Sequence, residues 1–374
     1  MINRERLINL FLELTKIDSV SREEREMVDR LITEFNEMDI MVKEDDTGVK
    51  INGNAGNLIA ELPGDENYPA ILLSAHLDRV EPGRGIEPVI RDEYIESSGE
   101  TVLGGDDLIG IAAIIEVLKI IKEEKIFHGP LKIIFSVAEE VGLQGTSNLC
   151  EDELKGLDYG LVFDVDGEIG TVVHRAPSQI KFNARIRGKA AHAGINPRSG
   201  INAIKISSIA ISNMKLGQID NETTANIGVI KGGKARNIVP EVVELEGEAR
   251  SHSEEKLLEQ QQHMQEIIDR SVRKYGGQVE YDIKKLYQSF AIDSESDIIK
   301  MVKMAAGDLG LSFELMASGG GSDANTFNLM GLPAVNLGTG MERVHSTEER
   351  VKINNIYKLV ELILKILEHS KSFK

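Results

Sequence analysis

Four apolar segments of this chain are predicted to be buried strands, and acidic or histidine residues follow each of them. The strands with their polar ends occupy residues 70–78, 131–140, 157–167 and 332–345. In an open α/β sheet, the loops beyond the carboxyl ends of the strands converge on one crevice. We therefore expect side chains that are far apart in the sequence to meet there, namely His76, Asp106, Glu139, Glu140, Asp166 and His345.

The length of the chain and the order of its predicted elements favour two domains. A single hydrophobic core seldom serves 374 residues. Between residues 57 and 170, predicted strands alternate with a helix, as in a sheet that is covered by helices. After Gly170 the order becomes β-α-β-β-α-β, the ferredoxin-like plan. We predict an α/β fold in which a domain with a mixed sheet is interrupted by a small inserted domain, with boundaries at 1–176 plus 289–374 and 177–288.

Two amphipathic helices are predicted within residues 1–40. Ser21 stands three residues before Glu24 near the start of the second helix, and this is the spacing of a capping box. In a capping box, each of the two side chains accepts a hydrogen bond from the backbone N–H group of the other residue. Both side chains are therefore expected to stabilise the first turn of this helix.

Charge, cysteine content and motifs exclude several classes of function. The chain has 43 basic and 61 acidic residues, and a formal net charge of −18 argues against nucleic acid or an anionic membrane surface as a partner. The most apolar stretch, residues 109–121, contains charged residues and is too short to span a bilayer. No secretion signal is evident, and the single cysteine, Cys150, suits a reducing compartment, so a cytoplasmic protein is expected. No serine-nucleophile, dinucleotide-binding or P-loop motif is present.

Three carboxylates of the convergent set carry negative charge that requires compensation by cations. These are Asp106, Glu140 and Asp166, and two divalent cations with one bridging hydroxide would balance their charge. Two cations about 3.5–4 Å apart lower the pKa of a shared water and polarise a carbonyl group. Mixed histidine and carboxylate ligands suit zinc, with cobalt or manganese as plausible substitutes.

Two positions in this set have competing candidates. Glu139 and Glu140 are adjacent at a strand end, and one of them is expected to bind metal while the other stays free. Neighbouring negative charges would raise the pKa of the free glutamate toward a value that is useful for proton transfer. Asp164 and Asp166 compete for one ligand position, and the turn at Gly167 favours Asp166.

Each of these residues also has an explanation that involves no chemistry. The sequence His76-x-Asp78 fits a metal ligand whose second ring nitrogen is held by a carboxylate, but it also fits a surface histidine near an unrelated aspartate. Asp106 fits a helix N-cap, where the helix dipole stabilises a carboxylate. The glutamate pair could be solvated, and His345 could be an ordinary loop histidine. Only the convergence of the whole set favours a metal site.

The inserted domain contributes further candidates for substrate binding. His192 lies among small residues, and Asn237 and Arg250 could recognise a substrate carboxylate, since arginine binds carboxylates bidentately. A turn histidine, a strand-start asparagine and a surface arginine are the simpler alternatives. The glycine-rich loop that contains Gly320 and Ser322 could present backbone N–H groups to an anionic group, or it could be a flexible linker.

A series of short motifs occurs in an order that resembles a known enzyme family. The motifs are SAHLD, LGGDDLIGIA, SVAEEVGLQG, FDVDG, GKAAHAG, ARNIVP, GGGSDAN and MERVHS. Over nearly its full length, the chain is similar to the dinuclear zinc exopeptidases and deacylases. This family includes tripeptide aminopeptidases (peptidase T), glutamate carboxypeptidase, aminoacylase and acetylornithine deacetylase. The peptidase T-like members are the most similar. The segment AEEVGLQGTSNL also resembles glutamyl and deblocking aminopeptidases, but their additional domain precedes the bridging aspartate, whereas an insertion after Asp166 fits the peptidase T plan.

The resemblance implies the ligands of two metal ions. One zinc ion would be held by His76 and Asp166, and the other by Glu140 and His345. Asp106 would bridge the two ions, and its peptide bond to the following aspartate would be cis.

The resemblance also implies the other residues of the reaction. Glu139 would act as general base on a metal-bridging water, and Asp78 would orient His76. In the inserted domain, His192 would stabilise the oxyanion. The substrate would be bound by Asn237, Arg250, Gly320 and Ser322. Relatives use this domain as a lid and dimerisation domain, so a homodimer joined through it is expected.

The implied function is that of an aminopeptidase which hydrolyses amide bonds of short peptides. A small-molecule amidohydrolase, such as an N-acyl-amino-acid deacylase or a carboxypeptidase-like enzyme, is the alternative. An inactive metal-binding protein is a third hypothesis. Leu108 stands where relatives usually have lysine, and this departure leaves the substrate preference open.

Overall fold

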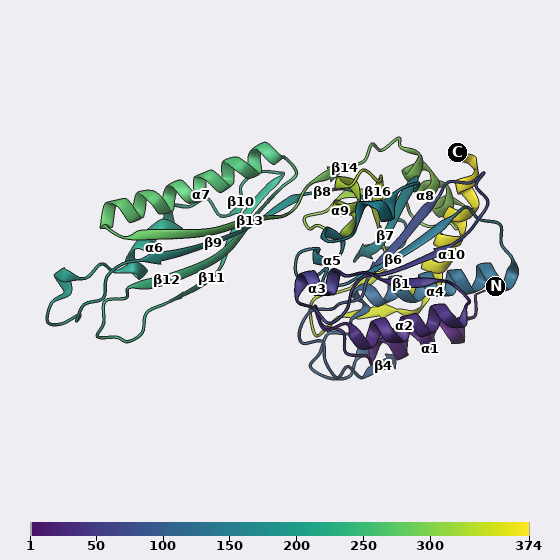
Figure 1. Ribbon diagram of the computed structural model, residues 1–374, viewed down its shortest axis with the longest axis horizontal. Coiled ribbons are helices and arrows are strands. Elements are labelled where there is room, and N and C mark those ends of the chain that lie inside the picture. The colour runs from purple at the N-terminus through teal and green to yellow at the C-terminus, as the bar shows by residue number, and fades with distance from the viewer. Residues whose placement is uncertain (1, 374) are drawn as a thin grey trace. The chain divides into compact units, whose positions relative to one another are not determined.

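The computed structural model describes residues 2–373, which form two compact units (Figure 1). The first unit contains the chain up to residue 175, residues 291–318 and the chain from residue 322 onward. The second unit contains residues 176–290 together with residues 319–321. Residues 319–321 of the glycine-rich loop were predicted to belong to the first unit, but they lie in the second.

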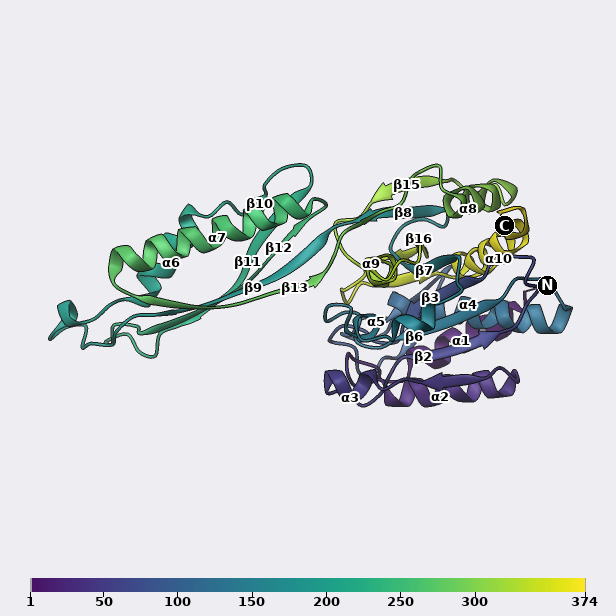
Figure 2. The same ribbon diagram turned by 45° about the horizontal axis from the view of Figure 1, so that its top comes forward.

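A mixed sheet forms the centre of the first unit, and Figure 2 shows its strands side by side. The strand order is β1-β2-β6-β3-β7-β16-β8-β14, and β15 pairs with β8. The central strands β6, β3, β7 and β16 are parallel, β2 runs antiparallel to β6, and β8 runs antiparallel to β16 but parallel to β15. The strands are β1 (Val42–Glu44), β2 (Leu58–Leu62), β3 (Ile71–His76), β6 (Leu131–Ser136), β7 (Tyr159–Val165), β8 (Thr171–Ala176), β14 (Phe290–Ala291), β15 (Glu314–Ala317) and β16 (Ala334–Gly338).

Helices cover this sheet, which confirms the predicted fold class. Helix α4 packs against β3 and β7, and α1 and α10 pack against α4. Residues 108–115 of α4 are all buried, because this helix lies in the middle of the core. The helices are α1 (Arg4–Thr15), α2 (Arg25–Glu37), α3 (Thr47–Ile51), α4 (Gly105–Glu124), α5 (Gln144–Ser147), α8 (Asp297–Asp308), α9 (Asp323–Leu329) and α10 (Ile353–Ser370). A smaller sheet has the order β17 (Met341–Glu342), β18 (Arg350–Lys352), β5 (Tyr94–Ser97) and β4 (Pro88–Arg91).

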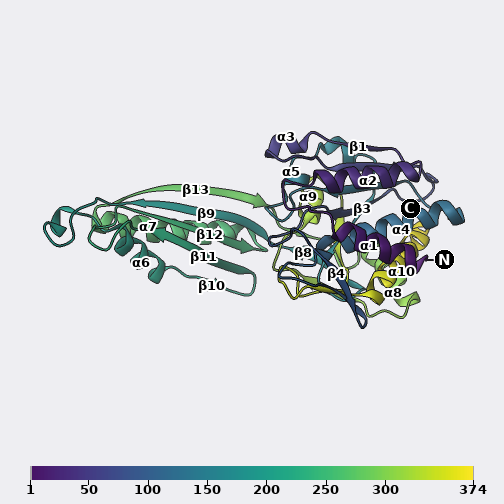
Figure 3. The same ribbon diagram turned by 90° about the horizontal axis from the view of Figure 1, so that it is seen from below.

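The second unit has the β-α-β-β-α-β order that its sequence predicts, with one additional two-residue strand, β10, between α6 and β11. Its antiparallel sheet has the order β10-β11-β12-β9-β13, which can be followed in Figure 3. Helices α6 and α7 pack on the sheet, and Phe182, Leu245 and Ile268 lie in the core between them. The elements are β9 (Ser178–Arg187), α6 (Ala203–Asn213), β10 (Gly217–Gln218), β11 (Thr223–Gly232), β12 (Val242–Ser251), α7 (Glu254–Tyr275) and β13 (Gln278–Tyr287).

The bounds of the long helix α7 follow from residues at its two ends. The side chain of Ser253 accepts a hydrogen bond from the backbone N–H group of Lys256 and thereby caps the first turn. Gly276 ends the helix with a φ of 79°, a left-handed conformation that glycine adopts without steric cost. The sequence signals for this helix were therefore sufficient to place it.

The predicted capping box at the start of α2 is wrong. Helix α2 begins at Arg25, and its N-cap residue, Glu24, makes no side-chain capping bond within the described residues. The side chain of Ser21 donates to Asp78 instead, on a different segment of the chain. Tertiary contacts have replaced the local pairing that the spacing indicated.

Among residues 2–373, no helix combines the length and the apolar character that a membrane span requires.

Candidate metal centre

His76 lies at the carboxyl end of β3, and both of its ring nitrogens are accounted for. Its Nδ1 atom lies 2.8 Å from the backbone carbonyl oxygen of Asp78, which can only accept a hydrogen bond, so Nδ1 carries the proton. When the ring is neutral, as a metal ligand must be, its Nε2 atom therefore presents a lone pair. That atom lies 3.0 Å from Oδ1 of Asp106 and 3.7 Å from Oδ1 of Asp164. A neutral imidazole held in this way is a ready metal ligand.

Asp106 lies between two histidines and offers one carboxylate oxygen to each. Its Oδ1 atom faces His76, while its Oδ2 atom lies 3.2 Å from Nε2 of His345. The same Nε2 atom lies 3.0 Å from Oε1 of Glu140. The peptide bond between Asp106 and Asp107 is cis. This arrangement brings together two groups of ligand atoms that share one carboxylate.

The donor atoms fit divalent cations. Zinc ligands at about 2.0–2.1 Å in a tetrahedral site lie roughly 3.4 Å from one another. The distances from the two histidine Nε2 atoms to the carboxylate oxygens range from 3.0 to 3.7 Å. Ligand atoms of His76, Asp106 and Glu140 lie within 4.8 Å of one another, as do those of His76, Asp107 and Asp164. Both groups contain His76, whose Nε2 atom can bind one cation. A second cation could be held where Nε2 of His345 meets the carboxylates of Asp106 and Glu140.

The electrostatics of the cluster also favour bound positive charge. Burial alone would lower the pKa of His76, but hydrogen bonds to Asp106, Asp164 and Asp78 raise it well above its usual value. Burial raises the pKa of Asp164 to about 8, and the charge of Asp106 adds to this effect. Carboxylates crowded in this way repel one another, and a cation between them removes the repulsion.

Asp164, and not the predicted ligand Asp166, lies beside His76 in the structure. Strand β7 continues to Val165, so Asp164 is a residue of the strand and Asp166 is not. In the parallel pairing of β3 with β7, Ser74 lies opposite Val162. Two residues farther along each strand, His76 and Asp164 therefore lie level on one face. Asp166 has the same parity but lies beyond the strand end, where it is exposed.

The two adjacent glutamates have different surroundings. Glu140 belongs to a ligand group, with its Oε1 atom 3.0 Å from His345. Glu139 is buried, and burial together with the charge of Asp164 raises its pKa well above the usual value. A raised pKa suits a carboxyl group that must accept a proton and later release it.

Asp78 is buried beside His76, but its side chain has a second set of partners. The imidazole is oriented mainly by the backbone carbonyl of Asp78, because the carboxylate Oδ1 is 3.5 Å from Nδ1. The two carboxylate oxygens accept hydrogen bonds from the backbone N–H groups of Glu139, at 2.8 Å, and Glu140, at 3.2 Å. Asp78 therefore fixes the main chain of both glutamates.

Two buried acids near the cluster were missed by the sequence analysis. Glu349 accepts backbone hydrogen bonds from Leu103, Gly104 and Asp106 at 2.8 to 3.0 Å, so it shapes the loop that carries Asp106. Asp323 accepts hydrogen bonds from the hydroxyl groups of Ser136 and Thr146. Neither acid follows a predicted strand, and no local signal in the sequence distinguishes them from surface acids.

Within the second unit, His192 lies on an exposed loop and has a defined tautomer. Its Nδ1 atom accepts hydrogen bonds from the backbone N–H groups of Gly194, at 3.2 Å, and Ile195, at 3.1 Å. The proton of the neutral ring therefore lies on Nε2, which is free to donate. The backbone carbonyl of Asn237 accepts a hydrogen bond from Ala193, so these two predicted residues lie on neighbouring loops.

The guanidinium group of Arg250 is already paired with a carboxylate. Its Nε and Nη2 atoms lie 3.0 and 3.1 Å from the two oxygens of Glu248, in a bidentate arrangement. Its Nη1 atom donates to the backbone carbonyl of Gly319, which precedes the predicted residue Gly320. Ser322 is buried, and its hydroxyl group caps α9 in a capping box with Asn325.

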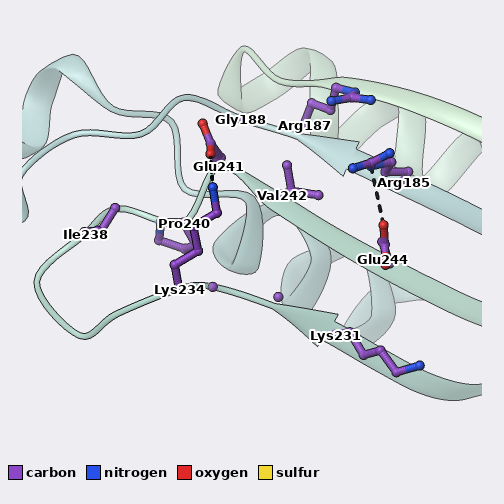
Figure 4. A pocket seen from close by; sticks show the side chains of 12 residues that line it. Arg185, Arg187, Gly188, Lys231, Lys234, Ile238, Pro240, Glu241, Val242 and Glu244 are labelled. Atoms are coloured by element: carbon purple, nitrogen blue, oxygen red, sulfur yellow. Dashed lines mark hydrogen bonds and ion pairs between the residues drawn. The ribbon is translucent and has the colours of Figure 1, made fainter.

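A surface pocket of about 540 Å³ on the second unit is lined in part by Ile238, which follows Asn237 in the chain and pairs with His192 (Figure 4). Four basic side chains line it, but each is paired with a carboxylate. The pairs are Arg185 with Glu244, Arg187 with Glu280, Lys231 with Glu246 and Lys234 with Glu241. The charge of each of these four basic side chains is therefore already balanced by a carboxylate of the same unit.

Comparisons with known proteins agree with one another. The sequence pattern of peptidase family M20/M25/M40 matches residues 72–369. The chain is 41% identical over 370 residues to the uncharacterized protein YqjE of Bacillus subtilis, covering 99% of this chain and 100% of that protein. It is 28% identical over 296 residues to peptidase T of Fusobacterium nucleatum, covering 78% and 70% of the two chains.

Solved structures give a matching result. A tripeptidase from Staphylococcus aureus is 40% identical, with a TM-score of 0.95 and 100% of both chains covered. The aminopeptidase PepT from Bacillus cereus is also 40% identical, with a TM-score of 0.89 and 99% of both chains covered. A dinuclear metal-binding M20 peptidase from Bacillus subtilis shares the fold at 20% identity, with a TM-score of 0.73 and 98% of both chains covered.

Proposed function

This chain belongs to peptidase family M20/M25/M40 and is a metallopeptidase, and from this premise we propose that it is an aminopeptidase that hydrolyses short peptides, tripeptides above all. The observation that carries the proposal is the position of Asp106 between His76 and His345, with one carboxylate oxygen directed to each histidine. This geometry is what two neighbouring cations that share a ligand require.

Five residues are proposed to hold two divalent cations, with zinc as the proposed metal. His76 and Asp164 belong to one site, Glu140 and His345 to the other, and Asp106 to both. When bound, such cations lower the pKa of a water molecule and polarise the amide carbonyl group of a substrate.

The chain's own residues would move the proton and hold the substrate. We propose that Glu139 accepts the proton of the attacking water on its carboxylate and then delivers it to the leaving amine. His192 is suited to donate from Nε2 to the carbonyl oxygen on which negative charge develops, because its Nδ1 atom is occupied by backbone N–H groups. Asn237, Arg250, Gly320 and Ser322 remain proposed substrate-binding residues, Ser322 through its backbone.

The pairing of Arg250 with Glu248 favours an aminopeptidase over a deacylase or carboxypeptidase. The guanidinium N–H groups of Arg250 that would bind a substrate carboxylate already donate to the carboxylate of Glu248. Leu108, which replaces the lysine usual in relatives, is buried in α4 and brings no charge toward the metal ligands. Neither observation favours a substrate with a free carboxyl group beside the scissile bond.

A comparison of substrates tests this proposal. Trialanine and other tripeptides would be compared with N-acetylmethionine, each in the presence of zinc, cobalt or manganese. We expect kcat/KM to be higher for the tripeptides, with release of the N-terminal residue. Faster hydrolysis of N-acetylmethionine would establish the deacylase alternative, and absence of turnover on every substrate would favour an inactive metal-binding protein.

A pair of variants tests whether Asp164 or Asp166 is the metal ligand. Asp164→Ala should weaken zinc binding by more than the roughly 10–100-fold that follows loss of an outer-sphere partner. The exposed Asp166 provides a matched control, and Asp166→Ala should bind zinc like the unaltered protein. Zinc affinity would be measured by competition with a chromogenic chelator. The opposite ranking of the two variants would restore Asp166 as the ligand.

A homodimer joined through the inserted domain and a cytoplasmic location are also proposed. Strand β13 lies at the edge of the second sheet and presents backbone groups along residues 278–287, and such an edge can pair with another chain. Cys150 is a free, exposed thiol, which suits a reducing compartment. Light scattering after size-exclusion chromatography tests the dimer, and a mass equal to one chain at micromolar concentration would contradict it. Cell fractionation tests the location.

A further inference from the structure

The loop that precedes α2 lies against the metal centre and not against its own helix. The backbone oxygen of Ser19 accepts a hydrogen bond from Arg79 at 3.0 Å, and the hydroxyl group of Ser19 donates to Leu77 at 2.7 Å. Two residues later, the hydroxyl group of Ser21 donates to Oδ2 of Asp78 at 2.5 Å. The loop is thereby fixed alongside the segment that follows His76.

Glu24 extends this contact to the segment that carries the two glutamates. Its Oε1 atom accepts a hydrogen bond from the backbone N–H group of Ala138 at 3.0 Å and another from Arg22 at 2.7 Å. Because Asp78 accepts the next two N–H groups, three successive backbone donors, from Ala138 to Glu140, end on buried carboxylates. The N–H groups of this segment are held by side chains rather than by a strand partner, since β6 ends at Ser136, while its carbonyl groups at Ala138 and Glu139 accept hydrogen bonds from residues 142–144.

The conformation of the segment explains why it needs such support. Ala138 has a φ of 50°, in the left-handed region that residues with a side chain seldom adopt. Backbone conformations of this kind persist only where surrounding contacts determine them. The turn at Ala138 directs the chain out of β6 and places Glu139 and Glu140 at the metal centre.

Glu24 lies at a position where a carboxyl group is expected to reduce the free energy of unfolding. It is fully buried, and its Oε2 atom has no hydrogen-bond partner among the described residues. Burial raises the pKa of Glu24 to about 7, and the charge of Asp78 adds to the rise. Burying two carboxyl groups side by side costs free energy that an apolar pair would not. A role at the neighbouring site would offset this cost.

We propose that Ser21 and Glu24 are positioning residues, which act through Asp78 and Ala138 to hold the main chain of Glu139 and Glu140 in place. Ser21 fixes the carboxylate of Asp78, and Glu24 fixes the left-handed turn that precedes the general base. The catalytic part of this inference rests on the proposed function. The structural part, the restraint of residues 138–140, does not.

Variants of Glu24 and Ser21, studied in the zinc-loaded full-length protein, test the inference. In Glu24→Ala, hydrogen exchange of the amides of residues 138–140 should become at least tenfold faster. With trialanine as substrate, kcat should fall about 10–100-fold while KM changes less than twofold. Glu24→Gln should recover most of both losses, because its Oε1 atom still accepts both N–H groups. Ser21→Ala should show a smaller effect of the same kind.

Glu34 provides a matched control for a general loss of stability. It is buried like Glu24, but it pairs with Arg30 and Lys119, on α2 and α4. Glu34→Ala should lower the melting temperature without accelerating exchange of residues 138–140 selectively or lowering kcat. The inference is overturned if Glu24→Ala leaves the exchange of these amides no faster than Glu34→Ala does. If the unaltered protein cleaves no peptide, the proposed function fails, while the exchange measurement still decides this inference.

Discussion

Replacing Glu139 by glutamine is expected to lower kcat for tripeptides by about 10²–10⁴-fold, the contribution typical of a general acid or base. Glutamine has nearly the same shape as glutamate but cannot accept the proton of the attacking water. Glu139 does not belong to either ligand group, and its main chain is held by Asp78, so zinc content should not change. Metal analysis and steady-state kinetics on the same sample give both values.

Glu140→Gln provides the contrast to this variant. The two glutamates are neighbours in sequence, but only Glu140 lies 3.0 Å from His345. Its replacement should therefore lower metal content as well as activity. If Glu139→Gln retained full turnover with its metal bound, the assignment of the general base would be wrong.

Removal of metal by a chelator is expected to abolish activity and to destabilise the first unit. Asp106, Asp164 and Glu140 lie together at the strand ends, and without cations their mutual repulsion is offset only by protons and by two histidines. A ligand at a thousandfold its dissociation constant stabilises the folded state by about 4 kcal/mol. Melting temperatures with and without chelator, and activity on trialanine, would be measured together.

Re-addition experiments complete this test. Zinc, cobalt or manganese should each restore activity to the chelated protein, because all three accept mixed histidine and carboxylate ligands. The Asp106→Asn variant should respond least, since it weakens the ligand that both sites share. A protein that contained no metal and was indifferent to chelator would contradict a dinuclear centre.

The strand-end pattern was sufficient to predict most of the cluster and the fold class. A parallel sheet brings the ends of β3, β6 and β7 to one edge, so residues of these strand ends had to meet whatever their separation in sequence. The order of elements in the inserted domain could also be predicted, because the alternation of apolar and polar residues in strands and the capping residues of helices are local signals. The sequence favoured Asp166 over Asp164 as the ligand because residues two apart in a strand point to the same face. Only the length of β7 distinguishes the two positions.

The supporting acids could not be predicted in the same way. Ser21 and Glu24 have the spacing of a helix cap, and nothing local shows that their partners are Asp78 and Ala138. Glu349 accepts three backbone hydrogen bonds from a loop about 245 residues earlier, and such a bond leaves no trace in a local pattern. Positions of this kind become visible only when the packing is known.

The pairing of β9 with β13 has a consequence for how the chain reaches its native state. His345 and Glu349 follow the inserted unit, so the ligand set cannot be completed until residues 176–290 have been synthesised. Gln179 lies opposite Tyr287, and the point where the chain enters this unit is thus next to the point where it leaves. Once this unit has folded, the ends of the two flanking segments are held close together, so a long unstructured loop no longer has to be closed. The entropic penalty of bringing His345 back to Asp106 is reduced accordingly.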